Sequence, residues 1–550
     1  MSKNLSELSG RKGLSKNLFE ELGKAAAQTG TPTKDQLENI RNEFLVGKSS
    51  VYGTVSFYDF LKPENQGKKV YVCNGTACMT AGTQKNVHDK VSKEFAPSEI
   101  GEMCCLGRCH ENSAFHIGGR NYSGSDIDNL HQIKTTKQLT AEKYNVGAIG
   151  AAVLTKDYGD VDAYYDIFRN AIKQPVSDLL THLKDSGLRG RGGAGFSMAF
   201  KLESCKNVDS DKKFIVCNAD EGDPGAYSDR YIMEQRPHSL LMGMMMAGYI
   251  VGADYGVVYI RGEYPESVDI ISECIEDLRS KKLLGENILG SGFNFEFKVI
   301  KAQGAYICGE ETALLSSIEG QRPEVRVRPP YPTQQGLFNK PTVVNNVETL
   351  ANLPFIFKNG GKAYAAIGTA KSTGTKLISL DGYFNNPGIY EADMGTPLSV
   401  VINQLGGGFK KPIKAMHIGG PLGGLVPISK IDNLNVDFDS FAKEGFLLGH
   451  ASVVCIPEDF PLIKYIEHLF KFTAHESCGK CFPCRLGSTR GYELVEKAQN
   501  EDYKIDMTLM QDLLETLETG SLCALGGGLP LPVKNAMKYF EDELSPYFKK

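Results

Sequence analysis

The spacing of hydrophobic residues divides the chain into segments of different secondary structure. Residues 1–62 place apolar side chains at three-to-four spacing, as in SKNLFEELGKAAA and KDQLENIRNEFLV, which predicts helices. From Lys69 the pattern changes to short β-rich runs such as KVYVC and AFHI, with one helix predicted near 84–94. Residues 126–175 are mostly polar, which indicates a connection to the next unit.

Helices and β-rich runs alternate over residues 176–370. KFIVCNA, YGVVYIRG and FEFKVIKA are separated by helical patterns, which predicts a doubly wound α/β domain. The uncharged stretch Leu240–Ala253 is shorter than the roughly 20 apolar residues of a bilayer span, so we expect a buried core helix. Residues 371–435 indicate a smaller strand-rich module, and residues 436–550 return to helices around a cysteine-bearing loop.

The pattern as a whole predicts a multidomain α/β protein. Its predicted segments are an N-terminal helical segment (1–62), a unit of short strands (63–135), a connector (136–175), an α/β domain (176–370), a strand-rich module (371–435) and a helical domain (436–550).

Composition narrows the possible functions. Of the 550 residues, 41% are hydrophobic and 23% are charged, which is typical of a globular protein. A net charge of −5 argues against nucleic acid or an anionic membrane as a partner. No apolar run of signal-peptide length lies near the N-terminus, so we expect a cytoplasmic protein without a membrane span. The 14 cysteines are too sparse for a disulfide scaffold and need another explanation.

The C-terminal segment HESCGKCFPCR contains three cysteines separated by two residues each, and a fourth follows in GSLCALGGG. Three closely spaced thiolates with a remote fourth are typical of a [4Fe–4S] cluster. Structural zinc is the alternative, although zinc usually takes two separate cysteine pairs. The predicted ligands are Cys478, Cys481, Cys484 and Cys523.

Two cysteine pairs lie near the N-terminus, in CNGTAC and CLGRC, and each follows a predicted strand end. Four thiolates from two loops at one sheet edge can hold a [2Fe–2S] cluster. A zinc site and a thioredoxin-like fold that has lost its cluster are the alternatives. The predicted ligands are Cys73, Cys78, Cys105 and Cys109.

The other six cysteines are interpreted as ordinary thiols, mostly buried: Cys104, Cys205, Cys217, Cys274, Cys308 and Cys455. Cys104 is adjacent to a predicted ligand. We expect its side chain to point away from that of Cys105 if both residues are extended.

The glycine-rich run GLRGRGGAGF contains G-x-G-x-x-G at Gly190, Gly192 and Gly195. A dinucleotide-binding fingerprint requires a strand directly before it, whereas VSDLLTHLKDSG predicts a helix. Free backbone N–H groups and Arg191 still suit a phosphate or a flat ring system. A flexible hinge is the alternative.

Acidic and amide side chains cluster in the same domain. Asp220, Glu221 and Asp223 follow the strand KFIVCNA, whereas Glu310-Glu311 and Asn345-Asn346 lie further along the chain. Ligands of α/β sheets bind at the carboxyl ends of strands. Singly, these residues could be solvated turns or helix caps, but together they suit ribose, ribityl and flavin polar groups. The carboxylates also disfavour additional phosphates, which favours NAD(H) over NADP(H).

The chain resembles the NADH-oxidising flavoprotein subunit of respiratory complex I, which is related to diaphorase subunits of NAD-linked hydrogenases and formate dehydrogenases. The motifs that carry this resemblance cover about residues 176–550 and are RGRGGAGF, CNADEGDPGAYSDR, YIRGEYP, GAYICGEETALL, KPTVVNNVETLANLP and ESCGKCFPCR with CALG. The first 135 residues resemble the thioredoxin-like [2Fe–2S] subunit of the same complexes, although the gap between the cysteine pairs is short for it.

The resemblance implies a fold and a set of site residues. The fold comprises a thioredoxin-like domain, a Rossmann-like FMN domain, a ubiquitin-like β-grasp module at 375–430 and a helical [4Fe–4S] domain. FMN would be held by Gly190, Arg191, Gly192, Gly193, Lys201, Asn218, Asp220, Tyr306, Gly309, Glu310, Asn345, Asn346 and Thr349. NAD(H) would lie near Phe196, Asp223, Glu311, Arg328 and Tyr331, with Glu311 and Asp223 positioning the nucleotide.

The nucleotide region departs from the complex I pattern. Asp223 stands where glutamate is common, Arg328 replaces lysine, and Tyr331 replaces phenylalanine. Ser204 replaces an aromatic residue that stacks on adenine in some relatives. The shorter carboxylate is expected to weaken or reposition a ribose contact. GDPGA is found in hydrogenase-type relatives, which favours a hydrogenase as the partner.

The implied function is diaphorase chemistry in a multisubunit redox complex. Hydride would pass between NAD(H) and FMN, and single electrons would pass through the iron–sulfur clusters to or from a hydrogenase, a formate dehydrogenase or another iron–sulfur subunit. The alternatives are a flavin-based electron-bifurcating subunit that couples NAD(H) and ferredoxin, and a non-catalytic relay or scaffold subunit.

Overall fold

The computed structural model describes residues 14, 16–136 and 144–549, and our predictions for residues 1–13, 15 and 137–143 lie outside them. The N-terminal segment forms the predicted helices, α1 (Leu18–Thr29), α2 (Lys34–Glu43) and α3 (Lys48–Val55). Asn17 caps α1 by accepting a hydrogen bond from the Phe19 N–H. Tyr58, which follows α3, is fully buried and donates to Ser317 Oγ at 2.9 Å. This contact fastens the helical segment to the α/β domain.

The next unit is a four-stranded sheet in the order β2-β1-β3-β4. Its strands are β1 (Val70–Cys73), β2 (Ile100–Met103), β3 (Phe115–Ile117) and β4 (Arg120–Tyr122), and its helices are α4 (Thr76–Thr80), α5 (Gln84–Val91) and α6 (Leu130–Thr136). β1 and β2 are parallel, so their carboxyl ends lie at the same edge of the sheet. Both predicted cysteine pairs begin at that edge.

The α/β domain is built on a parallel sheet in the order β8-β7-β6-β9. The strands are β6 (Phe214–Ala219), β7 (Tyr255–Ile260), β8 (Glu296–Lys301) and β9 (Thr342–Asn346). The helices are α9 (Val176–Ser186), α10 (Met198–Lys206), α11 (Ser228–Gln235), α12 (Pro237–Val251), α13 (Pro265–Ser280), α14 (Glu311–Ile318), α15 (Val347–Ala351), α16 (Leu353–Asn359) and α17 (Gly361–Ala365). α12 is the buried helix that the sequence predicts.

The strand-rich module forms a six-stranded sheet in the order β13-β12-β14-β10-β11-β5. Its strands are β10 (Thr375–Leu380), β11 (Gly388–Asp393), β12 (Ile413–Ile418), β13 (Gly424–Pro427) and β14 (Ser452–Pro457), joined by β5 (Asn145–Ile149). Short helices α18 (Leu398–Val400) and α19 (Phe438–Lys443) accompany the sheet, and α7 (Val161–Tyr164) and α8 (Asp166–Ala171) follow β5. β5 comes from the segment that the sequence indicates as a connector, and it pairs in parallel with β11.

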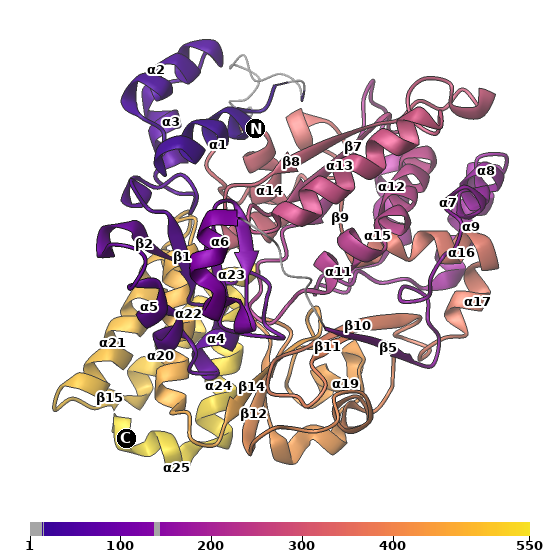
Figure 1. Ribbon diagram of the computed structural model, residues 1–550. Coiled ribbons are helices and arrows are strands. Elements are labelled where there is room, and N and C mark those ends of the chain that lie inside the picture. The colour runs from indigo at the N-terminus through magenta and orange to yellow at the C-terminus, as the bar shows by residue number, and fades with distance from the viewer. Residues whose placement is uncertain (1–13, 15, 137–143, 550) are drawn as a thin grey trace.

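The C-terminal segment is helical, as predicted. It comprises α20 (Leu462–Glu476), α21 (Ser488–Asn500), α22 (Met507–Gly520), α23 (Ala524–Gly528), α24 (Pro530–Tyr539) and α25 (Glu541–Leu544), with a small pair of strands, β15 (Ile505–Asp506) and β16 (Phe548–Lys549). These helices lie beside the N-terminal sheet (Figure 1), and Thr76 Oγ1 is 3.2 Å from His468 Nε2. The two cysteine-bearing units are therefore neighbours, although they stand at opposite ends of the sequence.

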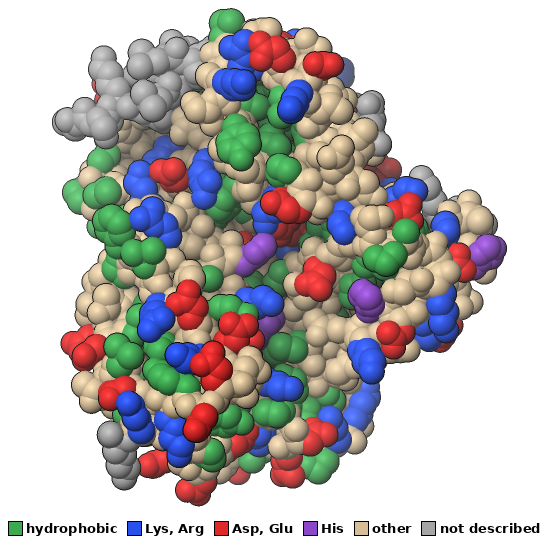
Figure 2. All heavy atoms as spheres, turned by 90° about the vertical axis from the view of Figure 1, so that its left-hand side faces the viewer, with side chains coloured by type: hydrophobic (Ala, Val, Ile, Leu, Met, Phe, Trp, Pro, Cys, Tyr) green, Lys and Arg blue, Asp and Glu red, His purple; other side chains and the backbone are tan. Residues whose placement is uncertain are grey.

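The lengths of the helices and the charges on the surface bear on membrane binding. Among the described residues, no helix combines the length and the apolar character that a bilayer crossing requires. On the face drawn in Figure 2, basic and acidic side chains are interspersed over the surface.

Candidate flavin and iron–sulfur sites

The glycine-rich loop follows helix α9, as the sequence predicts, and packs against the end of β9. The Gly190 N–H donates to the Phe196 carbonyl at 2.8 Å, which closes the loop. The Arg191 N–H donates to Thr349 Oγ1 at 2.8 Å. A Cβ atom placed on Gly192 would lie 2.8 Å from Asn346 Cβ, closer than packed atoms approach. The loop and the amide pair therefore form one wall.

The Arg191 guanidinium points into the core. It is fully buried and donates to Tyr364 Oη at 3.1 Å and to the Thr373 carbonyl, while its Nε has no hydrogen-bond partner among the described residues. These contacts hold the guanidinium in the core. A role for Arg191 in FMN binding stays a prediction.

Asp220 and Glu310 each present an unsatisfied oxygen. Asp220 Oδ2 and Glu310 Oε1 are buried and have no hydrogen-bond partner among the described residues. Burial raises the pKa of Asp220 well above its usual range. Asn218 Nδ2 donates to the Gly309 carbonyl at 2.7 Å, which joins the two strand-end segments. Buried acceptors without donors fit a ligand rich in hydroxyl groups, as the ribityl chain of FMN is.

Helix capping, the alternative interpretation of these polar residues, also holds for some of them. Glu310 Oε2 accepts from the Thr312 and Ala313 N–H groups at 2.9 Å, at the start of α14. Asn346 Oδ1 accepts from the Thr349 N–H at 3.1 Å, and Asn346 Nδ2 donates to Asp229 Oδ2 at 2.6 Å. Asn345 Nδ2 lies 2.9 Å from Met198 Sδ. Capping fixes Glu310 and Asn346 at the starts of α14 and α15.

Glu311 lies between two cationic side chains. Lys201 Nζ donates to Glu311 Oε2 at 3.2 Å and to the Val344 carbonyl at 2.8 Å, and Arg328 donates to Glu311 Oε1 at 2.9 Å. Phe196 and Tyr331 are 49% and 53% exposed. Exposed rings beside paired charges suit a nucleotide, which stacks its bases and needs cations for its phosphates.

Asp223 is held from two sides. Tyr306 Oη donates to Asp223 Oδ1 at 2.6 Å, and His450 Nε2 forms an ion pair with Asp223 Oδ2. Glu221 caps α11 instead of facing a ligand, because it accepts the Asp229 N–H at 2.9 Å. Sequence reasoning missed His450, which stands in no motif and lies far from Asp223 in the chain.

A buried ion pair lies behind this wall and predicts a large effect on stability. Lys376 Nζ contacts Glu348 Oε2, and the two side chains are 0% and 1% exposed. In Lys376→Met the Glu348 charge loses its partner, so we expect the free energy of unfolding to fall by about 3–5 kcal/mol. Urea unfolding measures this loss, and Lys376→Met/Glu348→Gln should recover part of it. A loss of less than about 1 kcal/mol would contradict an ionised pair.

The four N-terminal cysteines are arranged as two pairs. Cys105 Sγ and Cys109 Sγ are 3.6 Å apart, and the Gly225 N–H of the α/β domain donates to Cys109 Sγ at 3.2 Å. The hydrogen bond with Cys109, helped by nearby Arg261, lowers the pKa of Cys105 to about 7 despite burial. A hydrogen bond with Cys78 likewise lowers the pKa of Cys73. Both shifts favour the thiolate form, which is the form of cysteine that binds the iron of a [2Fe–2S] cluster.

Cys104 lies outside this pairing, but our reason for expecting that was wrong. Cys105 has a φ of 42°, in the left-handed region, so the two residues are not both extended. Cys104 instead lines a small cavity of about 10 Å³ together with Asp59, Asp220, Tyr306 and Glu476. The turn in the backbone separates the two adjacent side chains.

The four C-terminal cysteines come from two segments: Cys478 and Cys481 lie in the loop after α20, Cys484 lies in the short helix η10 (Pro483–Gly487), and Cys523 directly precedes α23. Cys478 and Cys484 are buried, whereas Cys481 and Cys523 are half-buried. Ser477 Oγ lies 3.3 Å from Cys484 Sγ. Burial raises the pKa of Cys484 to about 11 and that of Cys523 to about 12. These thiols release their protons when a metal binds, which couples cluster insertion to this local structure.

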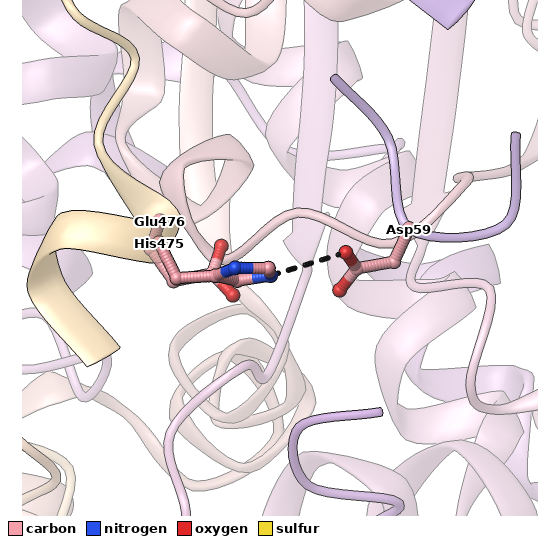
Figure 3. Close-up of side chains that lie close together, drawn as sticks. All are labelled: Asp59, His475 and Glu476. Atoms are coloured by element: carbon pink, nitrogen blue, oxygen red, sulfur yellow. Dashed lines mark hydrogen bonds and ion pairs between the residues drawn. The ribbon is translucent and has the colours of Figure 1, made fainter. Parts of the chain in front are cut away.

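An ion-pair junction joins the N-terminal segment to α20. Asp59, His475 and Glu476 bring their oxygen and nitrogen atoms within 4.8 Å of one another, and both helix residues point toward Asp59 (Figure 3). Lys62 Nζ lies 2.5 Å from Asp59 Oδ1 and 3.2 Å from His475 Nε2. The Tyr306 N–H donates to Glu476 Oε2 at 2.8 Å. Lys62 takes the place that a metal ion would need, so the cluster is an ion-pair network.

This junction predicts a pH-dependent contribution to stability. The Asp59 contact raises the pKa of His475 above 6.5, and His475 and Lys62 outweigh burial to lower the pKa of Asp59 below 3.8. The stabilisation by His475 is complete below 6.5 and is lost as pH rises through its raised pKa. We expect His475→Gln to destabilise by about 0.5 kcal/mol under mildly acidic conditions and less under alkaline ones, because the ring is half-exposed. Thermal unfolding across this range tests this, and a difference independent of pH would contradict it.

Comparison with known protein families agrees with this geometry. Residues 183–355 match the model of the Nuo51 FMN-binding domain. Residues 464–547 match the NADH-ubiquinone oxidoreductase-F iron-sulfur binding region, and residues 6–137 match the thioredoxin-like [2Fe-2S] ferredoxin. The matches contain all eight predicted cysteine ligands and show FMN, [4Fe–4S] and [2Fe–2S] as the cofactors.

Individual relatives cover most of the chain. NADP-reducing hydrogenase subunit HndC of Solidesulfovibrio fructosivorans is 40% identical over 74% of this chain and 83% of its own length. An NADH-quinone oxidoreductase subunit of Rhizobium meliloti is 39% identical over 69% of this chain and 91% of its own. A crystal structure of an NAD+-reducing [NiFe]-hydrogenase aligns with a TM-score of 0.85 and 28% identity over 98% of this chain and 94% of the other.

Proposed function

The chain belongs to the family of NADH-oxidising flavoprotein subunits that carry FMN and iron–sulfur clusters, and from this we propose that it is the NAD(H)-reacting subunit of a multisubunit hydrogenase. One observation carries the proposal: both cysteine sites lie beside strand-end loops of the α/β domain. The 220–227 loop supplies the unsatisfied Asp220 and the Gly225 N–H that binds Cys109. Tyr306 contacts Glu476, which lies two residues before Cys478.

The residues divide into three groups by what they offer. Asp220, Glu310 and Asn218 supply acceptors and a donor for the polar parts of FMN. Glu311, flanked by Lys201 and Arg328, supplies an acceptor for nucleotide hydroxyls next to cations for phosphates, and Phe196 and Tyr331 stack on rings. FMN, when bound, supplies the exchange between two-electron hydride transfer and one-electron transfer. The eight cysteines hold the clusters that receive single electrons.

We propose that NAD(H) is preferred over NADP(H). Glu311 is already paired with both neighbouring cations, so a further phosphate would compete with its carboxylate for Lys201 and Arg328. The expected result is a kcat/KM for NADH that exceeds that for NADPH by on the order of tenfold or more. Equal values, or a higher value for NADPH, would reject this preference without affecting the flavin assignment.

The partner proposal rests on the fused architecture. The hydrogenase structure aligns with 98% of this chain, including the thioredoxin-like unit, and the hydrogenase subunit HndC is 40% identical over 74% of it. We expect hydrogenase subunits to co-purify with the protein and to be identified by mass spectrometry. Recovery of formate dehydrogenase subunits or quinone-linked subunits in their place would overturn the partner. A cytoplasmic location is proposed because no disulfide joins the cysteines of the described residues, as is typical of a reducing compartment, and cell fractionation tests it.

A further inference from the structure

His450 extends from the six-stranded sheet to Asp223 of the α/β domain. It lies in the loop between α19 and β14, and it is 9% exposed. Its Nδ1 accepts a hydrogen bond from the Ser452 N–H at 3.3 Å, and its Nε2 pairs with Asp223 Oδ2. The contact with Ser452 fixes the ring, so that the other nitrogen is directed at the carboxylate.

The surroundings of His450 tie it to the glycine-rich loop. A Cβ atom placed on Gly193 would lie 3.8 Å from the Gly449 backbone and 4.0 Å from the backbone nitrogen of His450, which is ordinary packing contact. The charged groups that act on the imidazole are Asp223, Glu221 and Lys376. Glu221 is engaged by the helix that it caps, and Lys376 by Glu348. Asp223 is therefore the direct ionic partner of His450.

We propose that His450 is a positioning residue that holds Asp223 at the flavin pocket and that its positive charge raises the reduction potential of bound FMN. Hydride transfer from NADH brings negative charge to the pocket, which a nearby cation stabilises and a lone carboxylate opposes. His450 offsets the carboxylate of Asp223, which is also neutralised in part by the Tyr306 hydroxyl. The inference rests on the proposed function in that FMN must bind beside the glycine-rich loop.

The charge of His450 depends on pH in a defined direction. Burial disfavours the charged imidazole, but Asp223 outweighs burial and raises the pKa of His450 above 6.5. The imidazolium is therefore present near neutral pH and is lost as pH rises through the raised pKa. Its contribution to the flavin potential fades over the same range.

The test is a spectroelectrochemical titration of FMN in the full-length holoprotein, after flavin content has been measured. His450→Gln keeps a polar group at Asp223 but removes the charge, so its flavin potential should be more negative than that of the wild type near neutral pH, with a smaller difference in alkaline buffer. His450→Lys keeps a cation and should retain the higher potential to higher pH. His417→Gln is the matched control, because burial lowers the pKa of His417 to about 4 and keeps it neutral.

The outcomes separate this inference from the proposed function. If His450→Gln binds FMN and matches the wild-type potential at every pH, the inference is wrong and the diaphorase assignment stands. If His450→Gln loses FMN, the flavin potential of His450→Lys becomes the test. A potential that changes with pH in the same way as that of the wild type would reject the inference. If the wild type itself binds no FMN, the proposed function fails, and this inference fails with it.

Discussion

Replacing Cys481 by serine is expected to remove the C-terminal [4Fe–4S] cluster while leaving flavin reduction intact. Cys481 lies between Cys478 and Cys484 in the loop after α20, and a cubane cluster needs all four thiolates. Among the described residues, no hydrogen bond joins these four side chains to a predicted FMN residue, so NADH should still bleach the flavin. Iron content should fall by about four atoms per chain, and onward electron transfer by on the order of 100-fold or more.

The matched control for this variant is Cys274→Ser. Cys274 is also partly exposed, but it lies on α13, away from both cysteine sites. The control should retain full iron content and the electron paramagnetic resonance signals of both clusters. If Cys481→Ser kept the [4Fe–4S] signal, or if Cys274→Ser lost it, the assignment of ligands would be wrong.

Replacing Gly192 by alanine is expected to weaken FMN binding by distorting the wall of the pocket. The new Cβ would lie 2.8 Å from Asn346 Cβ, so the glycine-rich loop or the start of α15 must shift. Overpacking of this kind costs about 1–3 kcal/mol, and about 1.4 kcal/mol corresponds to a tenfold change in affinity. We expect FMN affinity to fall by on the order of 10- to 100-fold, as measured by fluorescence titration of the flavin-free protein.

Gly53→Ala is the control for this substitution. Gly53 lies in α3, and a Cβ atom there would meet nothing within 4 Å, so FMN affinity should not change. An unchanged affinity in Gly192→Ala would show that the flavin does not depend on the contact between the loop and Asn346.

The sequence predicted the kind of chemistry better than it predicted the contacts between domains. Ligand spacing alone predicted two cysteine sites, each inside a region that an iron–sulfur family model matches. The helical pattern before Gly187 argued against the dinucleotide fingerprint, and α9 confirms that a helix stands there. These signals are local, because a cluster or a loop imposes its spacing on neighbouring residues. The strand β5 was missed because NVGAI is short and forms an exposed edge that gives no burial pattern.

Long-range contacts escaped the sequence for a physical reason. The ion pair between His450 and Asp223 joins the strand-rich module to the α/β domain. The Gly225 N–H of the α/β domain donates to Cys109 Sγ of the N-terminal unit. Such contacts depend on how domains pack, and they leave no periodicity or spacing in either segment. Helix capping at Glu310 and Asn346, by contrast, is a local pattern that the sequence offered as an alternative.

The central claim is that this chain takes electrons from NADH and passes them to its own clusters. The most direct test is to add NADH anaerobically to the reconstituted holoprotein and to record flavin absorbance and electron paramagnetic resonance together. We expect the flavin band to bleach and a reduced-cluster signal to appear, with Cys481→Ser losing the C-terminal component. No bleaching and no cluster signal, with FMN and iron confirmed present, would contradict the account.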